Sequence, residues 1–244
     1  MAVNLVKGQN TVLDMNVFHV GLGWDVNEGV SQFNFDLDVA AFLIGSNKKT
    51  LGDDYLVFYN SEKRLKVDAH EIAPTYDKDG NKERHWEGTM ELIKPITIVN
   101  GPNTWSDNDS MRHESRPVDP DLSVIGSIDD EDGQTSEDGD DETMDINLDK
   151  VNPNVQEIVI TVSIYEWEKR RQNFGQVERA YVRLYKTGHE AEGKEDYRYD
   201  LTEDFSGCAS VEFCRLYRHN GAWKVQATGI AHKEGLEELV SKYM

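Results

Sequence analysis

The chain contains 244 residues, enough to bury a sizeable core, and its 46 acidic and 26 basic residues give a formal charge of -20 at pH 7. A charge of this sign repels phosphate backbones and anionic membrane surfaces, so nucleic acid is not an expected partner. No apolar run approaches the roughly 18 residues that span a bilayer, and the first thirty residues lack the pattern of a secretion signal. We therefore expect a cytoplasmic protein without direct membrane insertion.

Strand patterns recur along the chain. Residues 33–39 alternate between apolar and polar side chains, which predicts a half-buried strand with Asp36 and Asp38 on its polar face. Asn220-Gly221 lies between two strand-like runs and predicts a tight hairpin turn, because both residues tolerate positive φ. Composition and alternation predict further strands over residues 55–59, 157–167, 180–185 and 210–217.

The tail is the one segment with helical spacing of apolar side chains. Over residues 234–243 these are Leu236, Leu239, Val240 and Tyr243. Many strands, without a repeating strand-helix alternation, favour an all-β fold in which two sheets form a β-sandwich and a short C-terminal helix covers one of them.

Residues 61–134 have a different composition, rich in Asp, Asn, Pro, Gly and Ser, with one β-like island at residues 90–99. Loops of this length are unusual inside compact domains, so we interpret the segment as a long insertion that carries some structure of its own or is partly disordered.

Cys208 and Cys214 are the two cysteines, too few for a disulfide scaffold or a zinc site. They lie in strand-like sequence, where reduced thiols behave as small hydrophobic groups, so we predict a structural role for both.

Acidic residues are concentrated in one stretch. Thirteen lie between Pro117 and Asp149, with no Lys or Arg, and ten of them fall between Asp129 and Asp145. Two carboxylates about 4 Å apart repel by ~1 kcal/mol in water and ~4 kcal/mol near a protein surface, so close packing of several requires a cation. The alternative is a solvated acidic loop. The segment 138–142 favours a site, because a glycine between charged residues permits a sharp turn that leads into an alternating strand pattern.

Asp36 and Asp38 are two residues apart on the predicted strand and project from one face, and Asp25 lies shortly before them in the glycine-rich sequence GLGWD, which we interpret as a turn. An ordinary wet sheet face remains the alternative for this pair. Oxygen ligands without accompanying His or Cys indicate calcium or magnesium, and calcium is favoured because it accepts six to eight irregularly placed oxygens.

Motifs for catalysis are missing from the sequence: there is no HExxH, GxSxG, Walker A or Rossmann fingerprint, and the seven histidines are scattered. We therefore do not expect an enzyme.

Ten segments of the chain resemble, in their residues and in their order, segments of one protein family. They include VGLGWDV, FDLDVAAFLI, NFGQVERAYVRLY and LYRHNGAWKVQATGIA. Through these segments, over residues 1–60 and 123–244, the chain resembles the TerD family of tellurium-resistance and general stress proteins. The resemblance implies one β-sandwich domain over residues 1–244, with an insertion at about 61–122 and an acidic metal-binding loop at about 128–145.

The resemblance also implies two bound calcium ions and no settled catalytic activity. The family's acidic motifs correspond here to GLGWD, FDLD, FYN and GDDE, and Asp132 lies where members usually carry a GDN-type segment, with Gly133 in place of Asn. The implied metal ligands are Asp25, Asp36, Asp38, Asn60, Asp132, Asp140, Asp141 and Glu142.

Two functions follow as hypotheses. The first is a calcium-binding stress-response protein, in which the metal orders acidic loops that then bind other proteins of the stress or tellurium-resistance system. The alternative is a metal-dependent enzyme that handles a small molecule or tellurite, although two lone cysteines offer little for a reductase.

Overall fold

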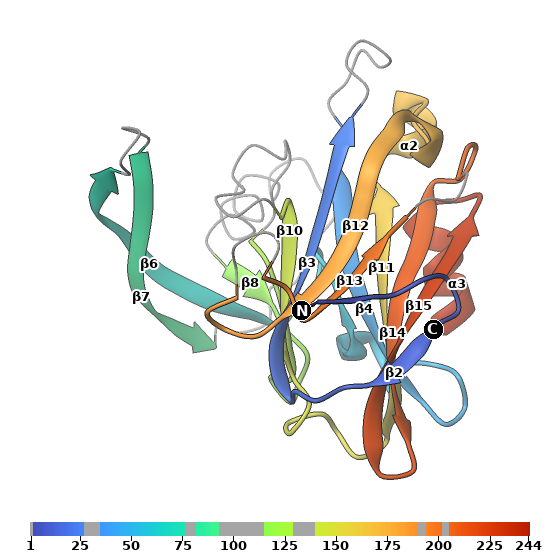
Figure 1. Cartoon of the computed structure of the whole chain (residues 1–244), viewed down its shortest axis with the longest axis horizontal. Helices are drawn as coiled ribbons and strands as arrows, with labels where there is room; N and C mark the ends of the chain where they lie inside the picture. Colours follow the sequence, from blue (N-terminus) through green and yellow to red (C-terminus); the bar gives the residue numbers. More distant parts are fainter. Residues whose placement is uncertain are drawn as a thin grey trace.

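The computed structural model describes residues 2–26, 35–76, 82–92, 115–128, 140–189, 194–201 and 205–244. Within them, two six-stranded sheets, here called sheet A and sheet B, pack against each other, and a three-stranded sheet extends from one side (Figure 1). The expected all-β sandwich with a short C-terminal helix is confirmed.

Sheet A contains six strands, and all of its neighbouring strands are antiparallel except β1 and β13. In spatial order they are β1 (Val3–Asn4), β13 (Tyr197–Asp200), β12 (Val177–Tyr185), β3 (Val17–Val26), β10 (Glu142–Asn147) and β9 (Val124–Gly126).

Sheet B is antiparallel throughout. In spatial order its strands are β2 (Asn10–Val12), β15 (Ala222–His232), β14 (Ser210–His219), β11 (Val155–Ile164), β4 (Leu37–Gly45) and β5 (Leu56–Val57). The predicted hairpin joins β14 to β15, with φ of 51° at Asn220 and 80° at Gly221.

The third sheet consists of β6 (Arg64–Tyr76), β7 (Lys82–Leu92) and β8 (Ser115–Pro117). Sequence composition predicted one β-like island at residues 90–99, but β7 ends at Leu92 and residues 93–100 lie outside the described part of the chain. The sequence RLKVDA at the start of β6 alternates between polar and apolar residues, which is a local strand signal. The polar composition of residues 61–134 as a whole obscured this signal.

The main core lies between sheets A and B and follows the period of two expected for strands. On β4, for example, Leu37, Val39, Ala41 and Leu43 point into it. Their neighbours Ala40, Phe42 and Ile44 are equally buried, because α3 (Leu236–Tyr243) covers the outer face of sheet B. Of the strand predicted over residues 33–39, residues 33 and 34 lie outside the described part of the chain and β4 begins at Leu37. Leu37 and Val39 face the core as the alternation predicted, but Asp38 on the other face is also buried.

In the described part of the chain, three short helices connect strands: η1 (Asp53–Tyr55), α2 (Trp167–Arg170) and η2 (Phe174–Gln176). The strand predicted over residues 55–59 is confined to β5, and the one predicted over residues 157–167 ends at Ile164. Glu166 adopts a left-handed conformation with φ of 47° and turns the chain into α2.

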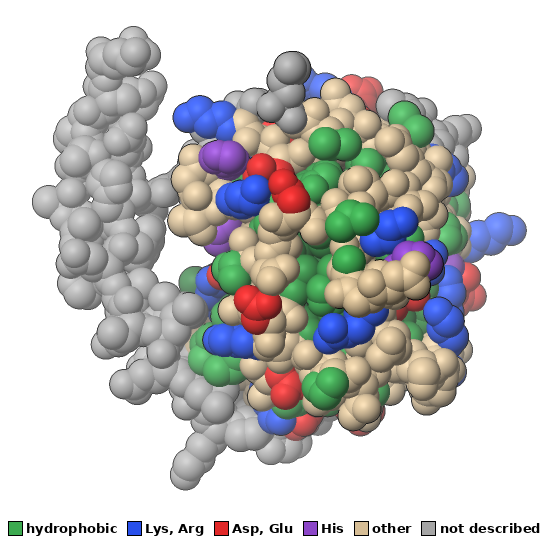
Figure 2. All heavy atoms as spheres, turned by 60° about the horizontal axis from the view of Figure 1, so that its bottom comes forward, with side chains coloured by type: hydrophobic (Ala, Val, Ile, Leu, Met, Phe, Trp, Pro, Cys, Tyr) green, Lys and Arg blue, Asp and Glu red, His purple; other side chains and the backbone are tan. Residues whose placement is uncertain are grey.

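Figure 2 shows one face of the molecule, on which acidic, basic and hydrophobic side chains are interspersed. The large negative charge of the chain is thus not spread as a uniform field over this face. No helix among the described residues combines the length and the apolar character needed to cross a membrane.

Candidate metal site at the edge of the sandwich

The acidic motifs lie at three strand ends. GLGWD forms the end of β3, FDLD leads into β4, and the GDDE block leads into β10. Strands β10 and β3 are antiparallel neighbours with Glu142 opposite Leu22, which places the block beside the end of β3. The structure thus places GLGWD and the GDDE block, more than a hundred residues apart in sequence, side by side.

Asp38 of sheet B and Glu142 of sheet A line the same cavity, at the edge where β4 lies across from β9 and β10. The two residues are 7% and 8% exposed. Tyr59 and Ser127 also line this cavity, whose volume is about 10 Å³. A cavity of this size holds about one water-sized particle, which is also the scale of a single cation.

Glu142 accepts a hydrogen bond from the Ser127 hydroxyl at this edge. Asp36, which is also buried, has an arginine beside it, with 3.4 Å between Arg170 Nη1 and Asp36 Oδ2. The guanidinium of Arg170 in turn lies over the Tyr165 ring, 5.1 Å from the ring centre. Burial of both aspartates argues against the alternative of an ordinary wet sheet face.

Asp140 is held by an arginine within sheet A. Its carboxylate accepts hydrogen bonds from Arg183 Nε at 2.7 and 2.9 Å and from the Tyr181 hydroxyl at 3.0 Å. Burial, reinforced by the nearby Asp140 charge, raises the pKa of Tyr181. The Arg183 charge balances that of Asp140, so we do not include Asp140 among the ligands of a metal.

Glycine makes this arrangement possible. A Cβ atom at Gly21 would lie 1.9 Å from Asp140 Oδ2, and one at Gly23 would lie 2.4 Å from the Tyr181 ring. The GLGWD segment is therefore part of strand β3 and not the turn that its glycines predicted. The two glycines leave room for the Asp140 carboxylate and the Tyr181 ring to lie directly against the backbone of β3.

The remaining predicted ligands have different surroundings. Asp25 forms an ion pair with Arg179, and Asp141 accepts a hydrogen bond of 2.8 Å from the Trp24 backbone N–H. Asn60 lines a separate hollow of about 410 Å³ together with Asp53 and Asp54. Asp132 lies outside the described residues.

The donors at the Asp38–Glu142 cavity suit calcium: two carboxylates and two hydroxyls, all oxygen. Within the described residues, no group of three or more His, Cys, Asp or Glu side chains is arranged to hold a metal ion. A calcium ion there would need further oxygens from hydroxyls, backbone carbonyls or water, all of which are common calcium ligands.

Sequence reasoning missed Ser127, because an isolated hydroxyl residue carries no motif. From the FYN motif it chose Asn60 and not the neighbouring Tyr59, which lines the cavity. It also missed Asp119, a fully buried carboxylate that accepts hydrogen bonds from the backbone N–H groups of Ser123 and Val124 at 2.7 and 2.6 Å. Burial raises the pKa of Asp119 despite these bonds. Its partners are all local, so its role is to shape the turn before β9.

The fold and this edge define an acidic β-sandwich protein with buried carboxylates between its sheets. The family model of the TerD domain matches residues 1–89 and 105–243, and the chain belongs to this family. It is thus a member of a family whose named proteins include tellurium-resistance and general stress proteins.

Individual relatives support this assignment. The chain is 34% identical to the tellurium resistance protein TerD of Alcaligenes sp., over an alignment that covers all of this chain and 97% of that protein. General stress protein 16U of Bacillus subtilis (strain 168) is 30% identical, with 100% and 97% covered.

Among solved structures, a homologue of the telluride resistance protein TerD from Streptomyces coelicolor A3(2) has a similar fold. Its TM-score is 0.54 at 14% sequence identity, with 93% of this chain and 95% of that chain covered. At this identity the likeness concerns the fold alone.

Proposed function

We propose that this protein binds calcium at the edge of the sandwich and that the bound ion orders an acidic surface used to bind partner proteins in a stress response. The observation that carries the proposal is the cavity shared by Asp38 of sheet B and Glu142 of sheet A. Membership of the TerD family supports the stress-response part.

Electrostatics gives the physical reason. Two buried carboxylates that face one small cavity repel each other more strongly than they would in water, because the effective dielectric constant is lower there. A divalent cation between them turns this repulsion into attraction and links the two sheets. Calcium binding is therefore expected to stabilise the folded state, as any ligand specific for that state does.

The test is calorimetric titration of calcium into chelator-treated protein. We expect a dissociation constant below about a millimolar, the weak end of biological calcium sites. Glu142→Gln and Asp38→Asn should each weaken binding at least about tenfold, since even outer-shell partners of a metal contribute that much. Circular dichroism of the apo variants checks that they remain folded.

Asp149→Asn is the matched control, because it removes an exposed carboxylate that does not line the cavity. Its calcium affinity should equal that of the unmodified protein. Equal losses in the control and in Glu142→Gln would show that net charge, and not this cavity, governs binding.

The enzymatic alternative gains no support from the thiols. Cys214 is buried, and burial raises the pKa of its thiol to about 12, which leaves almost no thiolate at neutral pH. Cys208 is a second free cysteine and is partly exposed. We therefore retain the binding function as the proposal.

A further inference from the structure

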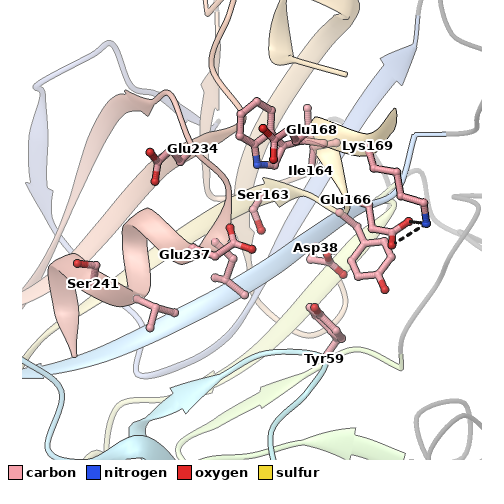
Figure 3. Close-up of a pocket in the computed structure, with 14 residues that line it drawn as sticks. Asp38, Tyr59, Ser163, Ile164, Glu166, Glu168, Lys169, Glu234, Glu237 and Ser241 are labelled. Carbon is pink, nitrogen blue, oxygen red and sulfur yellow. Dashed lines mark hydrogen bonds and ion pairs between the residues drawn. The ribbon is translucent and has the colours of Figure 1, made fainter. Parts of the chain in front are cut away.

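A groove of about 850 Å³ lies between α2 and α3, on the outer side of sheet B (Figure 3). Its lining includes the apolar side chains of Ile164, Trp167, Leu236 and Val240 and the aromatic ring of Tyr59. Trp167, Leu236 and Val240 are only partly buried. The volume falls in the range of pockets that bury several side chains or a small ligand.

The groove is also strongly acidic. Five carboxylates line it, and Lys169 is the one cationic residue among its lining residues. Lys169 is engaged by one of them, with 2.9 and 2.8 Å from its Nζ to the two carboxylate oxygens of Glu166. The acidic residues are Asp38, Glu166, Glu168, Glu234 and Glu237.

The walls of the groove are held in place. Trp167 lies against the residue before α3, since a Cβ atom at Gly235 would be 2.9 Å from Trp167 Cδ1. The Ser210 hydroxyl donates a hydrogen bond of 2.8 Å to the Glu234 carbonyl, which fixes the segment between β15 and α3. The acidic residues are therefore presented by a preformed surface.

We propose that this groove binds a basic, amphipathic peptide segment of a partner protein, with apolar side chains on the groove floor and Lys or Arg beside the carboxylates. A hydrophobic groove that accepts one face of an amphipathic helix is a common mode of peptide recognition. A cleft lined by one sign of charge concentrates ligands of the opposite sign. The inference specifies the partner chemistry of the proposed function and rests on its protein-binding part.

A second copy of this chain is a poorer occupant. Each copy carries a formal charge of -20, so two copies repel each other at long range. A basic segment of another protein gains the complementary attraction instead.

Asp38 couples the two sites, because it lines both the groove and the small cavity that contains Glu142. A ligand in the groove and an ion in the cavity therefore act on the same carboxylate, and each changes the affinity for the other by the same factor. Glu142 does not line the groove, and Glu237 does not line the cavity, so the two sites have separate variants.

The experiment is fluorescence anisotropy of a short labelled peptide of Lys and Leu in which Leu recurs at the helical spacing i, i+3, i+4, i+7, so that all Leu fall on one face of a helix. We expect saturable binding that weakens with added salt. Glu166→Gln combined with Glu237→Gln should weaken it about tenfold. The double control Glu62→Gln with Asp149→Asn removes the same charge from exposed positions outside the groove and should leave affinity unchanged.

Two further peptides test the two halves of the proposal: one with Glu in place of Lys, and one with Ser in place of Leu. Each should bind at least about tenfold more weakly. Bound peptide should also shift the fluorescence of Trp167, and this shift should disappear in Trp167→Phe. Equal binding of the peptides, or equal losses in the control and groove variants, overturns the proposal.

Calcium titrations of the same variants separate this inference from the metal site. Glu142→Gln should lose calcium affinity and still bind the peptide, whereas the groove variant should lose the peptide and still bind calcium. Calcium binding without peptide binding refutes the groove alone, and peptide binding without calcium binding refutes the metal site alone. Self-association that the groove variant abolishes would assign the groove to a second copy and also overturn the proposal.

Discussion

Asp140 and Arg183 form a buried ion pair over β3, with side-chain exposures of 2% and 0%. Taking two charges out of water is costly, and only their mutual attraction and hydrogen bonds offset the cost. Removing only one partner is therefore strongly destabilising, because the other charge then remains buried without compensation.

We predict that Asp140→Asn lowers the free energy of unfolding by about 3–5 kcal/mol, measured by urea denaturation, because it leaves a buried guanidinium uncompensated. Asp200→Asn is the comparison: Asp200 pairs with Arg198 at 2.8 Å but its side chain is 57% exposed. That variant should cost about 1 kcal/mol or less. Equal effects would show that burial does not decide the contribution of these pairs.

His232 lies between two carboxylates, with 2.7 Å from its Nε2 to Glu212 Oε1 and 3.1 Å from its Nδ1 to Glu238 Oε1. Glu212 is almost fully buried and also accepts hydrogen bonds from Lys242 and Tyr243. The hydrogen bond to Glu212 raises the pKa of His232. Burial on its own raises the pKa of Glu212, but the hydrogen bonds from His232 and Lys242 lower it below its usual value.

This cluster predicts a pH dependence of stability. The folded protein holds the His232 proton more tightly than the unfolded chain, so the stabilisation is complete below about pH 6.5 and is lost as the pH rises through the folded pKa. The difference in unfolding free energy between the unmodified protein and His232→Gln should shrink from about pH 6 to pH 9. A difference that grows over this range would contradict the assigned protonation.

Glu212 acts in the opposite direction. Its lowered pKa contributes stability above about pH 4.3, which is lost on further acidification. The cluster should therefore stabilise the protein most between these limits.

At the scale of elements, α3 converts one face of sheet B into a second core. Leu239 has no exposed surface and packs with Phe42, whose ring centre lies 5.1 Å from that of Tyr243. The same helix supplies Leu236 and Val240 to the acidic groove, and both also pack partly against this second core.

We predict that Leu239→Ala lowers the free energy of unfolding by about 2–5 kcal/mol, the usual cost of removing a fully buried leucine side chain. Val240→Ala on the half-buried side should cost less. Denaturant titration of both variants tests the order. A larger loss for Val240→Ala would mean that the groove side, and not the core side, holds the helix in place.

The elements also show where local sequence signals suffice. The hairpin at Asn220-Gly221 and the C-terminal helix agree with their predictions, because turn chemistry and helical spacing are local. Helix α2 has only four residues between left-handed residues Glu166 and Arg171, and its sequence carries no helical period. Packing of Trp167 against the core, not propensity, accounts for it.

At the scale of the whole molecule, the acidic sites depend on how two sheets meet. Asp38 and Glu142 come from different sheets, and Glu166 and Glu237 come from opposite walls of the groove. The groove and the cavity share Asp38, so the features proposed to bind calcium and a peptide occupy one continuous region. On the face in Figure 2, in contrast, charges of both signs alternate.

Local patterns in the chain were enough to predict the all-β class, the hairpin, the terminal helix and the family, because alternation, turn residues and motif order are properties of short segments. Which carboxylates lie beside an arginine and which line a cavity follows from the packing of the sheets and has no local signal in the sequence. Asp140 and Glu142 are only two residues apart, just before and at the start of β10, yet Arg183 holds the first and the second lines the same cavity as Asp38 of the other sheet. Charge balance depends on distances in space, and these are set by how the sheets pack.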